Sequence, residues 1–284
     1  MGGVGGRSKL ACGHLWAYNG HDMKREPPTL WTEQQLADPH RLPDKARRVH
    51  AMFAALSPVY DLLNHVLSFN LDRSWRRRAV RLLAPQPGQM VLDLCCGTGD
   101  LTLALACEQS RLDGIIGLDF VAPMLERAEI KYERWRERRG HNAPKGPPVR
   151  WICADAQELP LADHSVHGAA CAFGFRNLQD PLEALRQLRR VLVPGGRLVI
   201  LEFDLPRRGL WGWLYRAYFT LVLPRIGDIM ARQAKGAYRY LSASVQAFGT
   251  TTTLETLFRQ AGFVALKRKN LCGRAVVAWL VENT

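Results

Sequence analysis

A glycine-rich turn between two acidic residues is the segment of this chain best suited to bind a ligand. The turn runs from Asp93 to Asp100, after a short apolar run and before a helical pattern. Gly97 and Gly99 allow a tight turn and let a ligand approach the backbone where side chains would block it. A dinucleotide site would have a third glycine at position 102, where this chain has threonine, and it would avoid negative charge beside the pyrophosphate. The acidic flanks favour a ligand with an ammonium and a sulfonium group but no phosphate, which is the chemistry of S-adenosyl-L-methionine.

Further acidic residues follow the next two apolar segments. Asp119 ends the second segment, 20 residues after Gly99, where a carboxylate binds ribose hydroxyls in sheets of this kind. Asp155 and Ala156 come directly after the third segment. The Asp155 carboxylate can accept from an adenine amino group while the Ala156 backbone N–H donates to the ring. Because ligands bind at the carboxyl edge of parallel sheets, these positions predict one adenosyl-binding site.

Short apolar strands alternate with helical patterns along the chain, and this alternation predicts parallel βαβ units. Strands are expected at 90–94, 115–118, 149–153, 166–172, 197–203, 263–269 and 275–281. Helices are expected at 101–107, 123–138, 182–192 and 252–261, and a helical period interrupted at Pro58 covers 44–84. The last two strands have no helix between them, so one of them should run antiparallel. Residues 1–43 are expected to form a flexible N-terminal arm before one domain over 44–284, and either Met1 or Met23 fits as the start.

The composition limits the class of protein. The 284 residues include 39 Lys and Arg against 26 Asp and Glu, a net charge of +13, and 47% of them are apolar. The apolar share allows a globular core, and the charge suits a nucleic-acid partner or an anionic membrane surface. No apolar run reaches the roughly 20 residues that span a bilayer. The seven cysteines show no zinc-type spacing, so we expect a reducing compartment and no metal site.

A set of short motifs is similar to one enzyme family. In chain order they are Phe53, Tyr60-Asp61 with Asn64, Ser68-Phe69, Trp75-Arg76, the turn from Asp93 to Asp100, Gly117-Leu118-Asp119, Asp155-Ala156, Phe173-Gly174-Phe175-Arg176-Asn177, Leu201-Glu202-Phe203 and Tyr238 to Leu241. From about residue 45 to 284 the chain resembles the C-methyltransferases of menaquinone and ubiquinone biosynthesis (UbiE/MenG-type). The resemblance implies the α/β fold of class I methyltransferases, with a Rossmann-like, seven-stranded, mostly parallel sheet, N-terminal helices and a helical lid at about 205–248.

The resemblance also implies roles for particular residues. The expected contacts to S-adenosyl-L-methionine are Asp93, Gly97, Thr98, Gly99, Asp119, Asp155, Ala156 and Ala172. Position 172 is often serine in the family, so the alanine removes one side-chain contact to the donor. Arg176 and Asn177 are the expected catalytic residues, and Tyr60 and Tyr240 are the expected substrate-binding residues.

The implied reaction is methylation of a ring carbon on a prenylated quinol. A ring hydroxyl loses its proton, and the phenolate directs electron density onto the adjacent carbon, which attacks the sulfonium methyl in line. Arg176 stays cationic and therefore suits stabilisation of the phenolate rather than proton transfer. A water oriented by Arg176 and Asn177 is a candidate acceptor, and the identity of the general base stays open. The ring, naphthoquinol or benzoquinol, and the length of the tail also stay open.

The segment 205–230 indicates contact with lipid. Tryptophans and other apolar residues are interspersed with arginines there, a composition that suits a prenyl tail and a membrane interface. We therefore expect a cytoplasmic protein that associates peripherally with the inner face of the membrane. A buried or dimer-forming helix is the alternative, which leaves a homodimer open.

Other functions fit parts of the sequence. The net charge would suit a nucleic-acid methyltransferase, but residues 172–177 hold neither an Asn-Pro-Pro-Tyr-like tetrapeptide nor a catalytic cysteine, so no nucleic-acid partner is expected. A different lipophilic small-molecule substrate is compatible with the same motifs. A non-catalytic donor-binding scaffold is the third alternative, and intact acids at three successive strand ends argue against it.

Overall fold

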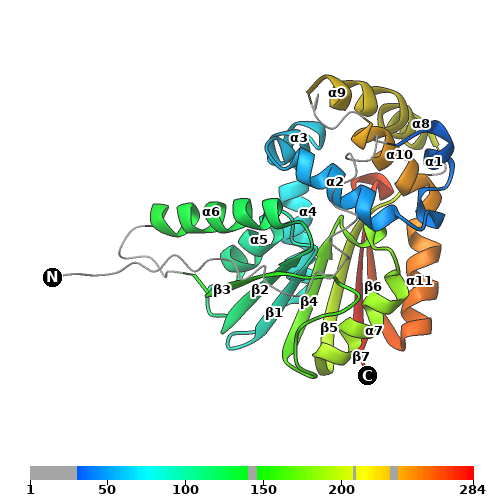
Figure 1. Cartoon of the computed structure of the whole chain (residues 1–284). Coiled ribbons are helices and arrows are strands. Elements are labelled where there is room, and N and C mark those ends of the chain that lie inside the picture. Colours follow the sequence, from blue (N-terminus) through cyan, green and yellow to red (C-terminus); the bar gives the residue numbers. More distant parts are fainter. Residues whose placement is uncertain (1–30, 140–145, 207–208, 231–235) are drawn as a thin grey trace.

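A seven-stranded sheet forms the centre of the fold (Figure 1). The structure is a computed structural model that describes residues 31–139, 146–206, 209–230 and 236–284. Its strands are β1 (Met90–Leu94), β2 (Gly114–Asp119), β3 (Val149–Cys153), β4 (Val166–Ala172), β5 (Leu192–Phe203), β6 (Phe263–Leu271) and β7 (Val276–Asn283). Their order is β3-β2-β1-β4-β5-β7-β6, and β7 alone runs antiparallel to its neighbours. The expected α/β class and the antiparallel last pair are confirmed.

The order of the strands predicts a ligand-binding crevice between the carboxyl ends of β1 and β4. The chain passes from β1 outward to β2 and β3, and then returns to the other side of β1 to form β4. Connections leave β1 and β4 in opposite directions, so their carboxyl ends are not covered by a crossover helix. The glycine-rich turn follows β1, and residues 173–177 follow β4, so both segments meet at this crevice.

Local sequence explains where the main helices begin. The α6 helix (Ala122–Arg138) has Pro123 in its first turn, where a missing N–H costs nothing. The α7 helix (Pro181–Val191) begins with proline, and the Asp180 side chain accepts from the backbone N–H groups of Leu182 and Glu183. The fifth strand begins five residues earlier than expected, because Leu192 pairs with Val166 ahead of a register shift.

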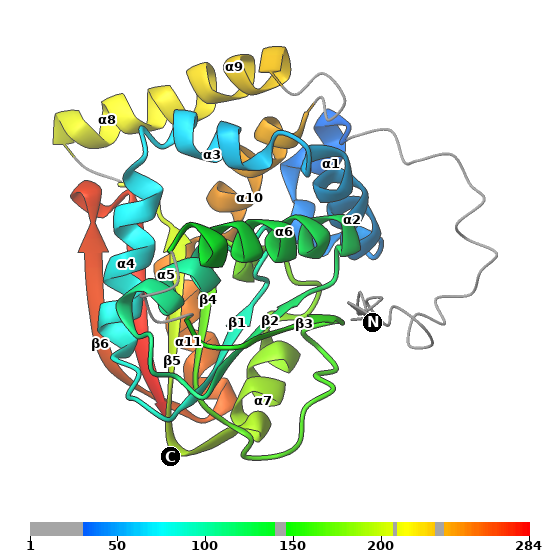
Figure 2. The same ribbon diagram turned by 90° about the vertical axis from the view of Figure 1, so that its left-hand side faces the viewer.

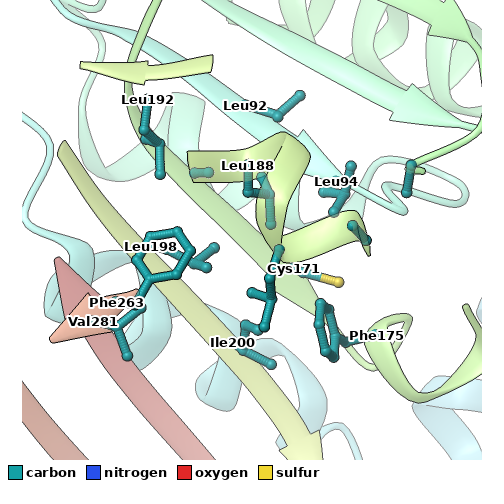
Figure 3. Packing of buried hydrophobic residues seen from close by; sticks show 14 of the residues in the cluster. Leu92, Leu94, Cys171, Phe175, Leu188, Leu192, Leu198, Ile200, Phe263 and Val281 are labelled. Atoms are coloured by element: carbon teal, nitrogen blue, oxygen red, sulfur yellow. The ribbon is translucent and has the colours of Figure 1, made fainter. Parts of the chain in front are cut away.

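Helices cover both faces of the sheet. On one face lie α4 (Leu71–Leu83), α5 (Asp100–Glu108) and α6, and on the other lie α7 and α11 (Thr250–Ala261) (Figures 1 and 2). The apolar side chains between the sheet and α7 and α11 form a buried cluster that includes Leu94, Leu188 and Ile200 (Figure 3). These layers make a rigid frame that fixes the strand ends.

A helical cap covers the carboxyl edge of the sheet (Figure 1). It consists of α1 (Glu33–Ala37), the 3-10 turn η2 (Pro39–Arg41), α2 (Lys45–Leu56), α3 (Tyr60–Leu67), α8 (Gly209–Ala217), the π-helical turn η4 (Tyr218–Val222), α9 (Leu223–Met230) and α10 (Ala237–Phe248). Its apolar side chains form a separate buried cluster, which joins residues 31–67 to residues 219–245. The N-terminal helices and the expected lid therefore form one cap.

The structure corrects two details of the sequence analysis. Residues 31–43, expected in the flexible arm, fold as α1 and η2, and Trp31 is 3% exposed against the cap. Residues 1–30 of the expected arm lie outside the described residues. The helical period over 44–84 divides into α2, α3 and α4, because Pro58 follows the first and the second ends at a corner where Phe69 and Asn70 adopt left-handed backbone. In the described part of the chain, no helix is long and apolar enough to cross a bilayer.

Candidate active site

Asp119 is held at the end of β2 by the glycine-rich turn. Its Oδ2 accepts from the Gly97 backbone N–H at 2.8 Å, and its Oδ1 accepts from the Val121 N–H at 2.9 Å. Gly97 has a φ of +54° and can take this conformation without strain. Burial raises the pKa of Asp119 to about 6, although the backbone donors oppose the shift. A carboxylate so fixed can accept hydrogen bonds from a hydroxyl pair.

A small cavity adjoins Asp119 and contains most of the expected donor contacts. Five expected positions line it: Gly97, Asp119, Asp155, Ala156 and Ala172. Asn177 also lines it, from the 3-10 turn η3 (Phe175–Asn177). We call this space the donor cavity. Its volume is about 60 Å³, whereas ligand sites commonly measure about 300–1,000 Å³, so its walls must move when a ligand of adenosyl size binds.

The remaining expected donor contacts do not line the donor cavity. The Asp93 carboxylate is buried and accepts from the Thr102 hydroxyl at 2.6 Å, and burial raises its pKa to about 7. The Thr98 hydroxyl donates to Asp61 Oδ1 at 2.5 Å and accepts from Lys131 Nζ at 3.1 Å. Gly99, with a φ of +81°, precedes α5. A Cβ there would lie 3.1 Å from Ala128 Cβ and 3.2 Å from the Trp151 ring, so the glycine permits close packing. These three residues shape the turn.

A larger cavity of about 350 Å³ lies beneath the cap, and its wall is mostly apolar and aromatic. We call it the apolar cavity. It shares Phe53, Tyr60 and Phe173 with the donor cavity, so the two spaces meet at these side chains. The two expected substrate residues, Tyr60 and Tyr240, both line it. Its charged side chains come from two places, the α3–α4 corner and Arg176 in η3, and the cap adds tyrosine hydroxyl groups.

Arg176 lies in the wall of the apolar cavity and is 4% exposed. Its Nη1 donates to both carboxylate oxygens of Glu202, at 2.9 and 3.0 Å, and to the Phe173 carbonyl at 2.6 Å. Its Nε donates to Ser244 Oγ at 3.3 Å. Glu202 is fully buried; burial raises its pKa, and Arg176 opposes the shift. The guanidinium is therefore oriented by acceptors on β5, on α10 and in the loop between β4 and η3.

Asn177 and Tyr240 are joined across the two cavities. The Tyr240 hydroxyl donates to Asn177 Oδ1 at 3.0 Å. The Tyr240 ring stacks on Trp31 with centroids 4.2 Å apart, and burial raises the pKa of its phenol. Tyr240 thus forms part of the wall of the apolar cavity, while its hydroxyl binds the Asn177 amide, which borders the donor cavity.

Lys45 holds the turn that carries Arg176 and Asn177, and sequence reasoning missed it. Its ammonium donates to the Arg176 carbonyl at 3.0 Å and to the Leu178 carbonyl at 2.5 Å. Burial, with a smaller contribution from the Arg176 charge, lowers the pKa of Lys45 to about 7. Gln179 adds two contacts between the same segments, from the Ala46 N–H and to the Leu42 carbonyl. No motif marks Lys45, since a basic residue at the start of a helical pattern is ordinary.

A family comparison fits this geometry. The model of the ubiE/COQ5 methyltransferase family matches residues 42–281. The chain belongs to this family. It is 45% identical over 212 residues to a demethylmenaquinone methyltransferase of Thermus thermophilus, covering 75% of this chain and 91% of the relative. It is 36% identical over 234 residues to a ubiquinone/menaquinone biosynthesis C-methyltransferase of a Geobacter species, covering 82% and 95%. The predicted methyltransferase activity and the predicted donor, S-adenosyl-L-methionine, are confirmed.

Solved structures support the fold of this ubiE/COQ5 family member. A SAM-dependent methyltransferase from Aquifex aeolicus matches with a TM-score of 0.53 at 17% identity, over 74% of this chain and 89% of that one. A possible histamine N-methyltransferase from Thermotoga maritima matches with a TM-score of 0.52 at 19% identity, over 82% of this chain and all of that one. At this level of identity, the likeness concerns the fold alone.

Proposed function

We propose that this methyltransferase transfers a methyl group from S-adenosyl-L-methionine to a ring carbon of demethylmenaquinol. The observation that carries the proposal is the junction of the two cavities. The donor cavity, which has the Asp119 and Asp155 carboxylates in its wall, meets the apolar cavity at Phe53, Tyr60 and Phe173. The relatives named for demethylmenaquinone methylation, 43–45% identical, support this ring.

The donor cavity suits the adenosyl half of the donor. Asp119 accepts from the ribose hydroxyls, and Asp155 with the Ala156 N–H meets the adenine. Because Gly97 has no side chain, the ligand can lie directly against the backbone of the glycine-rich turn. In this arrangement the sulfonium methyl faces the shared wall at Tyr60 and Phe173, where the apolar cavity begins.

The apolar cavity suits the quinol. Arg176 stabilises the phenolate that forms when a ring hydroxyl loses its proton, because its charge stays fixed and its position is set by Glu202. The Tyr240–Asn177 pair borders both spaces. Catalysis then depends on holding the ring carbon and the methyl group within about 3–3.5 Å of each other. Since a cation and an anion neutralise each other in this step, a dry cavity favours it.

The mouth of the apolar cavity suits a membrane surface. Exposed apolar side chains gather on α3, the corner that follows it, α8 and η4: Leu62, Val66, Phe69, Leu210, Trp213, Leu214, Leu221 and Val222. Tyr218 of η4 donates to the Leu67 carbonyl of α3, so these elements are adjacent. Phe69 and Leu214 both line the cavity and are 73% and 48% exposed. We call this surface the apolar face. It would rest on the inner face of the membrane while a prenyl tail passes into the cavity.

The function is tested with purified protein, S-adenosyl-L-methionine and detergent-solubilised demethylmenaquinol under reducing conditions. Mass spectrometry should show one methyl group added to the naphthoquinol ring. The corresponding prenylated benzoquinol is assayed in parallel, and a clear preference for it would replace the proposed ring. Folded protein that binds the donor but methylates neither quinol would overturn the proposal.

A further inference from the structure

A second charged group lies in the wall of the apolar cavity, at the corner between α3 and α4. Ser68, Asp72 and Arg76 all line the cavity there. The corner is tightly formed, since Phe69 and Asn70 both have left-handed backbone between Ser68 and α4. Figure 2 shows α3 meeting α4 at the edge of the cap. Non-glycine residues adopt this conformation at a cost in free energy, so the contacts around the corner must hold it in place. The same contacts therefore set the positions of Ser68 and Asp72.

A continuous hydrogen-bonded chain leads from this wall to the surface. The Ser68 hydroxyl donates to Asp72 Oδ1 at 2.8 Å, and Asp72 Oδ2 lies 3.0 Å from His65 Nδ1. The Asp72 side chain is 4% exposed, whereas the His65 side chain is 18% exposed. His65 does not line the cavity. The three side chains therefore join the cavity to solvent through successive polar atoms.

The charges around this chain keep Asp72 ionised. Arg76 Nη1 lies 2.5 Å from Asp72 Oδ2, and its Nη2 lies 3.7 Å from Asp100 Oδ2. Lys131 pairs with Asp100 at 2.9 Å and with Asp61 at 2.5 Å. Burial alone would raise the pKa of Asp72, but Arg76, Ser68 and His65 together hold it below its ordinary value. The ionised carboxylate thus lies between the Ser68 hydroxyl, which donates to it, and an imidazole nitrogen within hydrogen-bond distance.

The proposed reaction needs such a route. Methyl transfer from a sulfonium to a ring carbon releases one proton per turnover, and this proton arises in a cavity whose wall is mostly apolar. Arg176 is cationic and bound to Glu202, so it cannot take the proton. Proton transfer is efficient only through groups within hydrogen-bond reach of one another, and Ser68, Asp72 and His65 meet this condition.

We infer that Ser68, Asp72 and His65 form a proton relay that carries the quinol hydroxyl proton from the apolar cavity to solvent. The inference rests on the proposed function. The hydroxyl proton passes to Ser68 Oγ while the Ser68 proton passes to Asp72 Oδ1, and the O–H electron pair stays on the quinol as the phenolate. The Asp72 carboxyl group then turns to bring its protonated oxygen to His65 and gives this proton to Nδ1 of a neutral imidazole that carries its own proton on Nε2. The Nε2 proton is released to water, and the ionised carboxylate turns back toward Ser68.

The test uses His65→Asn in the full chain, because the asparagine amide retains a donor near the Nδ1 position but cannot relay a proton. We expect kcat to fall about tenfold or more, while KM and donor affinity stay within about twofold. In the wild type, kcat should decline toward acid pH, since protonated imidazole accepts no further proton, and this limb should disappear in the variant. Added imidazole should restore part of the lost rate.

Two further variants sharpen the test. Ser68→Ala interrupts the relay at the cavity, so it should lower kcat without rescue by imidazole. The control is His164→Asn, at a distant histidine whose Nδ1 contacts the Leu192 carbonyl, and it should keep the wild-type profile. The relay is overturned if His65→Asn keeps the wild-type kcat and pH profile, or if the lost rate does not respond to imidazole. If the wild type is inactive on both quinols, the proposed function is overturned together with the relay. If the wild type is active, the results for the variants test the relay alone.

Discussion

Glu202 binds Arg176 with both carboxylate oxygens, at 2.9 and 3.0 Å from a single guanidinium nitrogen, and neither side chain is more than 4% exposed. Removing one partner of a buried ion pair leaves the other charge buried without a partner, which strongly destabilises the fold. The pair therefore fixes the position of the cation and excludes Arg176 as the proton acceptor. In the proposed reaction, Arg176 would place a permanent positive charge against the developing phenolate.

Replacement of Arg176 by alanine is expected to lower kcat by about 10²- to 10³-fold and to leave donor affinity nearly unchanged, because Arg176 lines the apolar cavity and not the donor cavity. Glu202→Gln keeps the guanidinium but weakens its anchor, so its kcat should be intermediate. Turnover assays and calorimetric donor titrations check this order. Loss of donor binding in Arg176→Ala with normal turnover at saturation would show that the roles are reversed.

Replacement of Asp119 by asparagine or alanine is expected to abolish measurable donor binding, because the carboxylate proposed to accept from the donor ribose is lost. Asp113→Asn, an exposed acid just before the opposite end of β2, provides the control and should bind the donor normally. Calorimetry with S-adenosyl-homocysteine avoids turnover. Equal affinity of Asp119→Ala and wild type would contradict the assignment.

Donor affinity is expected to depend on pH through the same carboxylate. Because burial raises the pKa of Asp119 to about 6, protonation below that pH removes an acceptor, and the dissociation constant should rise by at most about tenfold per pH unit. The free energy of unfolding should instead fall as pH rises. The folded protein holds the Asp119 proton more tightly than the unfolded chain, so it gains stability that is fully present below the ordinary pKa of 3.8. This stability is lost as pH rises through about 6. Asp119→Asn should flatten the pH dependence of folding stability, and an unchanged slope would exclude Asp119 as its source.

Replacement of Lys45 by methionine is expected to destabilise the protein by about 2–3 kcal/mol, because the buried carbonyls of Arg176 and Leu178 lose their donor. Turnover should also fall, since the turn that carries Arg176 and Asn177 loosens. Denaturant unfolding and kcat measurements check both effects. Arg41→Met, at a side chain that is 89% exposed and pairs only locally with Asp38, is the control. A stable, fully active Lys45→Met variant would show that the contacts are incidental.

Replacement of Leu210, Trp213 and Leu221 by serine is expected to weaken sedimentation with vesicles that contain phosphatidylglycerol. KM should rise for a membrane-embedded long-chain quinol but not for a short-chain quinol in solution. Val264→Ser with Leu266→Ser, at exposed apolar residues of β6, serves as the control. If the triple variant binds vesicles normally but changes its elution in gel filtration, the apolar face joins two copies of the chain instead.

The sequence predicted the parts of the fold and site that depend on local chemistry. Apolar strands such as Val91 to Leu94 and turn residues such as Gly97 carry their own signals. The expectation that Asp119 and Asp155 meet at one edge followed from parallel topology. The fold class, the seven strands and the type of coenzyme could therefore be inferred without coordinates.

Long-range contacts could not be predicted in the same way. Thr98 lies in the right turn, yet its hydroxyl points to Asp61 and Lys131 from two other helices. Asp93 flanks the turn, but Thr102 binds its carboxylate inside the sheet–helix interface. The hydrogen bond from the Lys45 ammonium to the Leu178 carbonyl joins residues that are 133 positions apart in the chain. Residue types and spacing do not encode such partners, because many folded arrangements satisfy the same local pattern.

The stacking of Trp31 on Tyr240 and the anchoring of the catalytic turn by Lys45 change the meaning of the N-terminal region. A stretch that looks like a dispensable leader supplies the ring that packs on Tyr240 and the ammonium that holds the turn at Arg176. An engineered version that starts at residue 46 would keep every strand of the sheet and still lose these contacts beside the proposed site. For any shortened form of this enzyme, the starting point has to lie before Trp31.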